Sequence, residues 1–344
     1  MKKILSKKYR SFVISLEIFS VILLVPLLYN YVPINEGSRT FYIPSSDINE
    51  VIKTLQTNGY EVTWIDEMML KSRSVPDEGW YSVEPEKHGR FTFFQKLYKQ
   101  KTDSLMDIVI YAGETKHEVT ARIANDVKLD RSVLLEIYEK LAQFEEADIL
   151  AQRYTIARDA DEYATMHYLF LDSRRKLEQF INDYFTHMPE PIELRIVHII
   201  ASIIQKESNA IEEMPLISSV IYNRLEKGMK LQMDGTLNYG PYAHTIVTPE
   251  RIRNDTSEYN TYKHKGLPPQ PLSTVTLDAL KASMEPASSD YLFFMLNENG
   301  THNFTESYEG HLENIRAFRA YQEEKMKKEQ ENNASLLTQN EINP

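Results

Sequence analysis

The stretch that decides the fold of this chain is Ile196-Val-His-Ile-Ile-Ala-Ser-Ile-Ile-Gln-Lys-Glu-Ser208. If it is helical, the isoleucines at positions 196, 200, 203 and 204 form one apolar stripe, and Glu207 continues that stripe. Burial at this place would favour the neutral carboxyl group and raise its pKa, as a proton donor near neutral pH requires. In the alternative interpretation, the helix ends at Glu207 and the side chain simply reaches water.

The N-terminus predicts a membrane anchor. The first ten residues carry five basic side chains and no acid, and a mostly apolar run of 23 residues, 12–34, follows. Such a run is long enough to cross a bilayer, and the basic flank of residues 1–11 stays on the cytoplasmic side. Glu17 lies near the cytoplasmic end of the run, where it can be protonated or reach the interface. A cleaved signal peptide is the alternative, but no small-residue cleavage site follows the run.

Composition limits the classes of function. The 344 residues are enough for two or three domains. Without the five N-terminal basic charges, the formal net charge changes from −11 to −16, so the exported part is acidic and is not expected to bind nucleic acid. The chain has no cysteine, which excludes disulfides and thiol catalysis, and its nine histidines show no metal-ligand spacing. We expect no metal and no cofactor.

Local patterns predict an α+β fold. Residues 41–51 and 109–119 align without a gap, and each consists of a short apolar strand, a turn and the start of a helix. The two strand-helix units belong to a region at 36–143. Within this region, residues 72–90 are rich in Pro, Gly and charge and are predicted as a loop.

Helical periodicity dominates from Leu134 onward. Helices are expected at about 166–184, 191–207, 215–227 and 274–283. The aromatic run 291–296 predicts a strand, and a hairpin turn at 297–300 leads to a second strand around 302–304. The polar residues 321–344 are predicted as a fraying helix followed by a disordered tail.

Polar and aromatic clusters follow Glu207 in loop-like sequence. They include Gln232, Asp234, Tyr239, 259–262 and 300–304. Amides and hydroxyls hydrogen-bond to sugar hydroxyls and tyrosine rings stack on sugar faces, so these loops indicate a glycan-binding cleft. Most of the 21 tyrosines are nevertheless expected to serve packing.

These motifs, taken together, resemble the endolytic murein transglycosylases, the YceG-like family. They occur in the family's order and are Ala201-Ser-Ile-Ile-Gln-Lys-Glu-Ser208, Ser218-Ser-Val-Ile-Tyr-Asn-Arg-Leu-Glu-Lys-Gly-Met-Lys-Leu-Gln-Met-Asp234, Tyr259-Asn-Thr-Tyr262, Gly266-Leu-Pro-Pro-Gln-Pro-Leu272, and Tyr291-Leu-Phe-Phe294 with Gly300-Thr-His-Asn-Phe304. The combination is far more specific than any one motif. The resemblance covers roughly residues 145–320, which it implies to be the catalytic domain. The N-terminal units also resemble the family's LysM-like region, and a single membrane anchor fits.

The resemblance implies roles for individual residues. Glu207 would be the catalytic acid and base, with Ser208 beside it. The residues expected to line the cleft or bind substrate are Gln232, Asp234, Tyr239, Asn260, Thr261, Tyr262 and His302.

Three positions depart from the family's pattern. Gln205 stands where many relatives have a second glutamate, which leaves Glu207 as the candidate acid of that motif. Gly235 replaces a usual proline and Gln270 a usual glycine, so the loop geometry there is less well defined by the resemblance. The stretch 148–154 also diverges, and no role is assigned to it.

The implied activity is cleavage of the MurNAc-β-1,4-GlcNAc bond within nascent glycan strands by a single carboxyl group. The acid protonates the glycosidic oxygen, then takes the proton of the sugar's own C6 hydroxyl, which closes a 1,6-anhydro ring. Because this nucleophile is tethered to the reacting carbon, no activated water is needed.

Location and partners follow from the same resemblance. We expect a single-pass protein of the bacterial cytoplasmic (inner) membrane with its catalytic domain on the periplasmic side. The expected partners are peptidoglycan strands, the membrane, peptidoglycan synthases and division proteins. Two alternatives stay open: a muramidase that uses Glu207 and Asp234 as two carboxylates, or a non-catalytic peptidoglycan-binding division scaffold.

Overall fold

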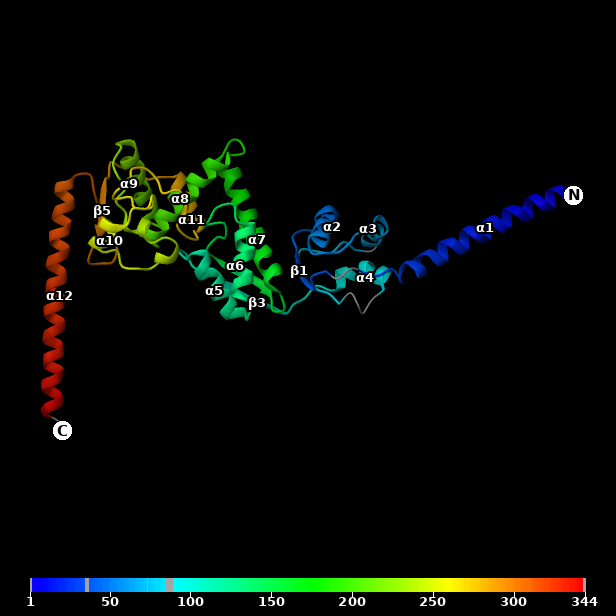
Figure 1. The fold of residues 1–344 in the computed structure, drawn as a ribbon, viewed down its shortest axis with the longest axis horizontal. Helices are drawn as coiled ribbons and strands as arrows, with labels where there is room; N and C mark the ends of the chain where they lie inside the picture. The colour runs from blue at the N-terminus through cyan, green and yellow to red at the C-terminus, as the bar shows by residue number, and fades with distance from the viewer. Residues whose placement is uncertain (1, 35–36, 73, 85–88, 343–344) are drawn as a thin grey trace. The chain divides into compact units, whose positions relative to one another are not determined.

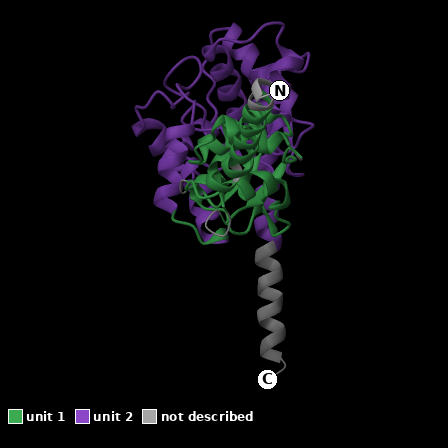
Figure 2. Cartoon of the chain, turned by 90° about the vertical axis from the view of Figure 1, so that its right-hand side faces the viewer, with its two compact units in different colours: residues 1–108, 127–130, 154–168 green, residues 109–126, 131–153, 169–344 purple. Residues whose placement is uncertain are grey.

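The chain folds into two compact units. The structure is a computed structural model and describes residues 2–34, 37–72, 74–84 and 89–342 (Figure 1). Unit 1 consists of residues 1–108, 127–130 and 154–168, and unit 2 of residues 109–126, 131–153 and 169–344 (Figure 2). Both units combine helices with short two-stranded sheets, which confirms the predicted α+β class.

The strands are short, whereas the helices range from single turns to the 35 residues of α12. Unit 1 contains α1 (Lys2–Tyr29), β1 (Thr40–Ile43), α2 (Ile48–Thr57), α3 (Trp64–Lys71), β2 (Gly79–Ser82), α4 (Arg90–Lys96), η2 (Leu97–Lys99), most of β3 (Leu105–Val109) and β4 (Arg153–Ala157), and the start of α7 (Glu162–Tyr184). Unit 2 contains the rest of α7 and α5 (Lys116–Val127), α6 (Arg131–Leu141), α8 (Pro191–Glu207), α9 (Met214–Glu226), η3 (Asp234–Leu237), η4 (Gly240–Tyr242), α10 (Pro249–Asn254), α11 (Leu277–Met284), β5 (Phe293–Leu296), β6 (His302–Thr305) and α12 (Tyr308–Ile342).

Helix α1 is the apolar N-terminal helix that the sequence predicted. Its segment Lys7–Tyr29 is long and apolar enough to cross a membrane. The helix ends at Tyr29, so it stops before the end of the predicted span at 12–34. Its position near the N-terminus is also compatible with a signal sequence, which length and composition alone do not distinguish from an anchor.

The core of unit 1 forms around the sheet of β1 and β2. The two strands are antiparallel, with Phe41 opposite Tyr81. The prediction of a loop at 72–90 was wrong at β2, because Trp80 and Tyr81 favour a strand and bury their rings even between polar neighbours. Residues 73 and 85–88 of that range lie outside the described part of the chain. The core side chains are Phe41, Ile43, Val51, Leu55, Tyr60, Leu70, Tyr81, Val83, Phe93, Phe94 and Leu97.

A buried ion pair lies inside unit 1. Arg90 is 2% exposed and Asp66 is 0% exposed, and Arg90 Nη2 donates to Asp66 Oδ2 at 2.7 Å. The guanidinium also donates to the backbone carbonyls of Glu61 and Pro33 at 2.7 and 2.9 Å, and to the hydroxyl of Tyr29 at 3.1 Å. One side chain thus connects α4, α3 and the end of α1.

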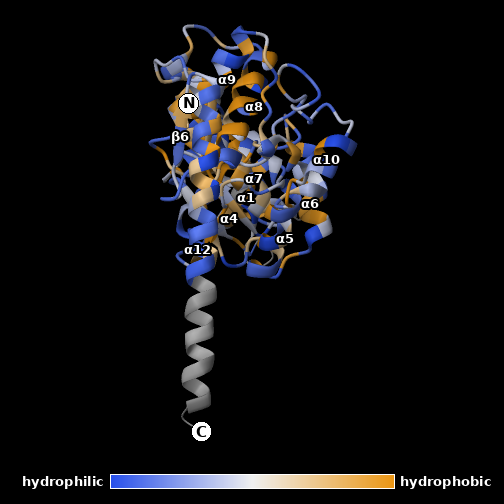
Figure 3. Ribbon diagram, turned by 90° about the vertical axis from the view of Figure 1, so that its left-hand side faces the viewer, coloured by the Kyte–Doolittle hydropathy of each residue, from blue (hydrophilic) through white to orange (hydrophobic). Residues whose placement is uncertain are grey.

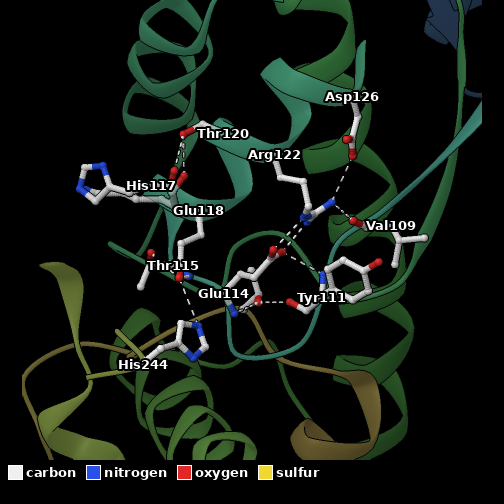
Figure 4. Close-up of polar contacts among 12 residues, drawn as sticks. Val109, Tyr111, Glu114, Thr115, His117, Glu118, Thr120, Arg122, Asp126 and His244 are labelled. Carbon is white, nitrogen blue, oxygen red and sulfur yellow. Dashed lines mark hydrogen bonds and ion pairs between the residues drawn. The ribbon is translucent and has the colours of Figure 1, made fainter. Parts of the chain in front are cut away.

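The second strand-helix unit is divided between the two compact units, because most of its strand β3 lies in unit 1 whereas its helix α5 lies almost entirely in unit 2. The backbone amides of Glu114 and Thr274 donate to Thr274 Oγ1 and to the Glu114 carbonyl at 3.1 and 2.8 Å. Lys206 Nζ donates to the carbonyl of Gly113 at 2.7 Å. Arg122 pairs with Glu114 and supports the same turn (Figure 4). These bonds join residues far apart in sequence, and local patterns do not reveal them.

The core of unit 2 surrounds α8. Helix α8 packs against α9, α11 and η3, and it is coloured orange over much of its length in Figure 3. Pro191 occupies its first turn, where a missing N–H costs nothing. The predicted hairpin is confirmed, since β5 and β6 pair antiparallel with Phe294 opposite Phe304.

Helix α12 runs to Ile342. A fraying helix followed by a disordered tail was predicted for 321–344, and the disorder at its end stays a prediction. Glu, Lys and Gln have high helix propensity, and Glu324 and Lys328 form an (i, i+4) ion pair at 2.6 Å, which stabilises the helical state. Residues 343–344 lie outside the described part of the chain.

Replacing Arg90 with leucine should strongly destabilise unit 1. The change leaves the buried carboxylate of Asp66 without its partner, and such losses cost about 3–5 kcal/mol. The matched control is Lys71→Ala, which breaks the exposed ion pair with Glu67 and should cost no more than about 1 kcal/mol. Thermal unfolding of the full-length protein in detergent measures both. An Arg90→Leu effect as small as the control's would contradict the assignment.

Candidate active site

Helix α8 brings Glu207 to the edge of the unit 2 core. Ile200, Ile203 and Ile204 are fully buried, as the stripe predicted. Ile196 is 40% exposed, so the buried stripe begins one turn later than expected. The helix ends at Glu207, as the alternative interpretation held, but the carboxyl group accepts a hydrogen bond from the protein at that point.

The environment of Glu207 favours its neutral form. Burial raises the pKa of this carboxyl group from 4.5 to about 7, and the negative charge of Asp234 acts in the same direction. The backbone N–H of Gly235 donates to Glu207 Oε1 at 3.0 Å and, with the positive charge of Arg224, opposes the shift. The result is an acid that is protonated in part of the molecules near neutral pH.

Gly235 meets two requirements at once. A Cβ atom at this position would lie 2.7 Å from Lys206 Cβ and 2.9 Å from Glu207 Oε1, which is too close for either contact. Its N–H is also the donor to Glu207, and a proline in its place would have no N–H to donate. Gly235 therefore provides both the space and the N–H donor that the candidate acid uses here.

Glu207 lies in a cleft of about 490 Å³. Five of the predicted site residues line it, and they are Glu207, Gln232, Asp234, Tyr262 and His302. The other lining residues are Arg224, Leu231, Met233, Phe293, Phe294, Met295, Leu296, Tyr308 and His311. A wall of aromatic and aliphatic side chains from β5 thus faces a set of polar groups, as a sugar-binding cleft requires.

The polar side of the cleft is held by internal bonds. Tyr262 donates its hydroxyl proton to Asp234 Oδ1 at 2.6 Å, which orients that carboxylate. Burial raises the pKa of the Tyr262 hydroxyl, so it remains a donor. Gln232 has a φ of +50°, an unusual conformation for a residue with a Cβ. Its backbone N–H donates to the carbonyl of Thr261 at 3.2 Å.

The predicted residues Asn260 and Thr261 do not line the cleft. Asn260 is 0% exposed and donates to the carbonyls of Ile252 and Asp255 at 2.9 and 2.8 Å. Thr261 Oγ1 accepts from the amide of Met233 at 3.2 Å. Because these polar groups are buried by the loops that they join, they support the loops carrying Tyr262 and Gln232.

Tyr239 and Ser208 also point elsewhere. The ring of Tyr239 stacks on Tyr259 with 4.2 Å between centroids, and its hydroxyl donates to Ser257 at 3.0 Å. Ser208 donates to Glu213 Oε2 at 2.9 Å.

Glu213 is a residue that the sequence analysis missed. Its carboxylate accepts from the backbone N–H of His302 at 2.6 Å and lies 2.8 Å from His302 Nδ1. Burial opposes its charge, but the bonds from His302 and Ser208 prevail and hold the pKa of Glu213 below its ordinary value. The buried carboxylate therefore fixes the imidazole that lines the cleft. Its only sequence signal was its position six residues after Glu207.

Arg224 was also missed, although it lies within a motif that was singled out. It is 7% exposed and donates to the carbonyl of Leu292 at 2.6 Å and to that of Leu231. Its guanidinium lies 5.2 Å from the ring centre of Phe293. One cation therefore joins the strand β5 to the loop that carries Gln232 and contributes positive charge near Glu207.

Comparisons with known proteins identify the family. Residues 41–317 match the YceG-like family, so the chain belongs to that family, as its motifs predicted. It is 26% identical to the endolytic murein transglycosylase of Bacillus subtilis (strain 168) over 287 residues, which are 76% of this chain and 77% of that protein.

Two further comparisons concern a shorter matching segment and a solved structure. The chain is 35% identical to the endolytic murein transglycosylase of Streptococcus pneumoniae serotype 2 (strain D39) over 122 residues, which are 34% of this chain and 22% of that protein. A crystal structure of a yceG-like protein from Listeria monocytogenes covers 80% of this chain and 97% of its own, with a TM-score of 0.52 and 23% identity. This second likeness shows the fold alone.

The protonation of Glu207 should make stability depend on pH. Its folded-state pKa of about 7 exceeds the ordinary 4.5, so its contribution is fully present below about pH 4.5 and is lost as the pH rises through about 7. Glu207→Gln removes this loss, and we expect the variant to be more stable than the wild type by on the order of 2 kcal/mol at about pH 8, with a smaller difference at about pH 4. Urea unfolding at both pH values measures the difference, and a pH-independent one would contradict the raised pKa.

Glu213→Gln should loosen the support of His302. The neutral amide accepts weaker hydrogen bonds than a carboxylate, and hydrogen bonds to charged groups contribute about 1.5–3 kcal/mol. We expect a loss of stability of this order together with slower cleavage of peptidoglycan. Glu212→Gln, at the exposed neighbouring position, is the control and should change stability by less than about 0.5 kcal/mol. Equal behaviour of the two variants in both measurements would remove Glu213 from the site.

Proposed function

We propose that this chain is a membrane-anchored endolytic transglycosylase that cleaves the MurNAc-β-1,4-GlcNAc bond within peptidoglycan glycan strands. The observation that carries the proposal is Glu207, a carboxyl group with a pKa raised to about 7 that lines a cleft of sugar-binding character. Membership in the YceG-like family supports it, as does the name endolytic murein transglycosylase that two relatives carry.

In the proposed mechanism, Glu207 acts twice. In its neutral form it protonates the glycosidic oxygen as the bond to the MurNAc carbon breaks. As a carboxylate it then removes the proton of the C6 hydroxyl of the same MurNAc, whose oxygen bonds to that carbon and closes the 1,6-anhydro ring. A pKa near 7 suits both steps, because proton donation and proton removal then cost comparable free energy.

The other cleft residues would bind and orient the glycan. Phe293, Phe294 and Tyr308 offer ring faces, while Gln232 and His302 offer hydrogen-bonding groups. Asn260, Thr261 and Ser208 would act indirectly, through the loops and through Glu213, because their side chains bond within the protein. For Tyr239, which stacks on Tyr259, the proposed role is likewise to support its loop.

A muramidase is the second candidate, and one observation favours it. Asp234 lines the same cleft as Glu207, and its negative charge acts on the Glu207 carboxyl group. Two carboxyl groups in one cleft are what a glycoside hydrolase needs, one as acid and one as nucleophile or base. The hydrogen bond from Tyr262 orients the Asp234 carboxylate, which would suit either a catalytic carboxylate or a group that orients substrate. The reaction products distinguish a muramidase from a transglycosylase.

The remaining parts of the proposal concern location. Helix α1 would anchor the chain in the bacterial cytoplasmic membrane with the basic N-terminus inside and the cleft outside. The LysM-like region would hold glycan strands, and peptidoglycan synthases and division proteins would be partners. A full-length chain recovered in the soluble fraction at physiological salt would contradict the anchor.

Product analysis tests the reaction. Wild-type enzyme acting on purified peptidoglycan should release chains that end in 1,6-anhydroMurNAc, each about 18 Da lighter than a reducing-end product because no water is added. Digestion in ¹⁸O-labelled water should leave them unlabelled. Glu207→Gln should lower the rate by about 10²–10⁴-fold while the protein stays folded, because glutamine cannot donate the proton.

Asp234→Asn is the matched variant. In a transglycosylase it should lower the rate less than Glu207→Gln does, since asparagine can still bond to Tyr262 and no second carboxylate is required. Labelled reducing-end products, together with an Asp234→Asn variant as inactive as Glu207→Gln, would establish the muramidase instead.

A further inference from the structure

An exposed aromatic side chain stands at the end of the apolar N-terminal helix. Trp64 is the first residue of α3 and is 73% exposed, and Met68, one turn later, is 49% exposed. The opposite face of α3 buries Asp66 in unit 1. The outer face also carries the ion pair of Lys71 with Glu67. The described residues of unit 1 leave much of this apolar pair in contact with water, although both side chains gain free energy when they leave it.

Hydrogen bonds fix α3 to the end of α1. Tyr29 is the last residue of α1, and its hydroxyl lies 2.5 Å from Thr63 Oγ1 and donates to Asp66 Oδ1 at 3.0 Å. Thr63 caps α3 directly before Trp64. Arg90 donates to both Tyr29 and Asp66 from inside the unit. The outer face of α3 is therefore attached to the helix end by a partly buried polar network.

The length of the apolar segment places this network at a membrane surface. Lys7–Tyr29 contains 23 residues and extends about 34 Å as a helix, slightly more than the roughly 30 Å of a hydrocarbon core. Tyr29 then lies in the interfacial layer. Tyr31, two residues further along the chain, is 84% exposed. Tryptophan and tyrosine favour this layer because their rings are apolar while their N–H or O–H groups remain in contact with water and headgroups.

We propose that the outer face of α3, Trp64 with Met68, inserts into the interfacial layer of the bilayer that α1 crosses, so that unit 1 lies on the membrane surface. The proposal rests on the proposed membrane anchor. Its ligand is the boundary between phospholipid headgroups and acyl chains, where Lys71 at the edge of the face meets lipid phosphates.

The two tryptophans of the chain allow a direct test. Trp80 is 3% exposed and donates from Nε1 to the carbonyl of Thr155 at 3.0 Å, so it is an internal reference that lipid does not reach. The full-length protein is reconstituted into vesicles of phosphatidylcholine and phosphatidylglycerol, with and without phosphatidylcholine brominated near the acyl carbonyl. Bromine quenches tryptophan fluorescence on close approach. Flotation of the same vesicles reports the anchor separately.

We expect the wild type to lose most of its Trp64 emission in brominated vesicles. Trp64→Phe, which keeps only Trp80, should be unquenched. Met68→Trp in the Trp64→Phe background should restore quenching, because position 68 lies one turn along the same face. If the protein floats with the vesicles but brominated lipid quenches wild type and Trp64→Phe equally, the surface assignment is overturned and the anchor stands. If the full-length chain does not float, both are overturned.

Discussion

The contact between Glu207 Oε1 and the backbone N–H of Gly235 is the interaction around which the candidate site is organised. This hydrogen bond joins the last residue of α8 to η3. Helix α8 contributes many side chains to the core of unit 2, and η3 begins with Asp234, which lines the cleft. The carboxyl group is buried enough for its pKa to rise and accepts this hydrogen bond, which limits the rise. A single carboxyl group that acts first as acid and then as base needs a pKa that is raised, but not so far that the carboxylate no longer forms.

The walls of the cleft depend on buried polar groups that never reach it. Arg224 bonds to carbonyls on both sides of the cleft, at Leu292 and Leu231, and Glu213 fixes His302. Asn260 and Thr261 have the same function beneath Tyr262 and Gln232. Irregular loops have few hydrogen bonds between backbone groups. Side chains must therefore pair with the buried backbone amides and carbonyls, and a loop is held rigid where such side-chain bonds form.

Unit 1 uses the same principle for a different purpose. The ion pair of Arg90 with Asp66 has little reason to be buried for stability alone, since a pair of apolar residues would serve as well. Its additional bonds join it to Tyr29, the last residue of the apolar helix, and to the carbonyl of Pro33 in the segment that follows. A membrane anchor joined in this way would orient unit 1, whereas a flexible linker would not.

The sequence by itself determined the elements that repeat a local pattern. These elements include α8 with its buried stripe, the hairpin of β5 and β6, and the apolar helix α1. The motifs also indicated the family and the group of residues that lie in one cleft, which are Glu207, Gln232, Asp234, Tyr262 and His302. For the last group the family's motifs were decisive, because periodicity left Glu207 ambiguous.

Only the tertiary structure decided which polar side chains face the cleft and which support it. Asn260, Thr261, Tyr239 and Ser208 have the chemistry of substrate ligands, and Glu213 and Arg224 look like ordinary surface charges in the sequence. Their roles depend on hydrogen bonds to residues between 2 and 89 positions away, such as that between Glu213 and His302. The division into units was likewise set by bonds such as that between Glu114 and Thr274. Local sequence indicates whether a segment favours a helix, a strand or a loop. The free energy of a buried polar group depends instead on its hydrogen-bond partner, which only the folded chain supplies.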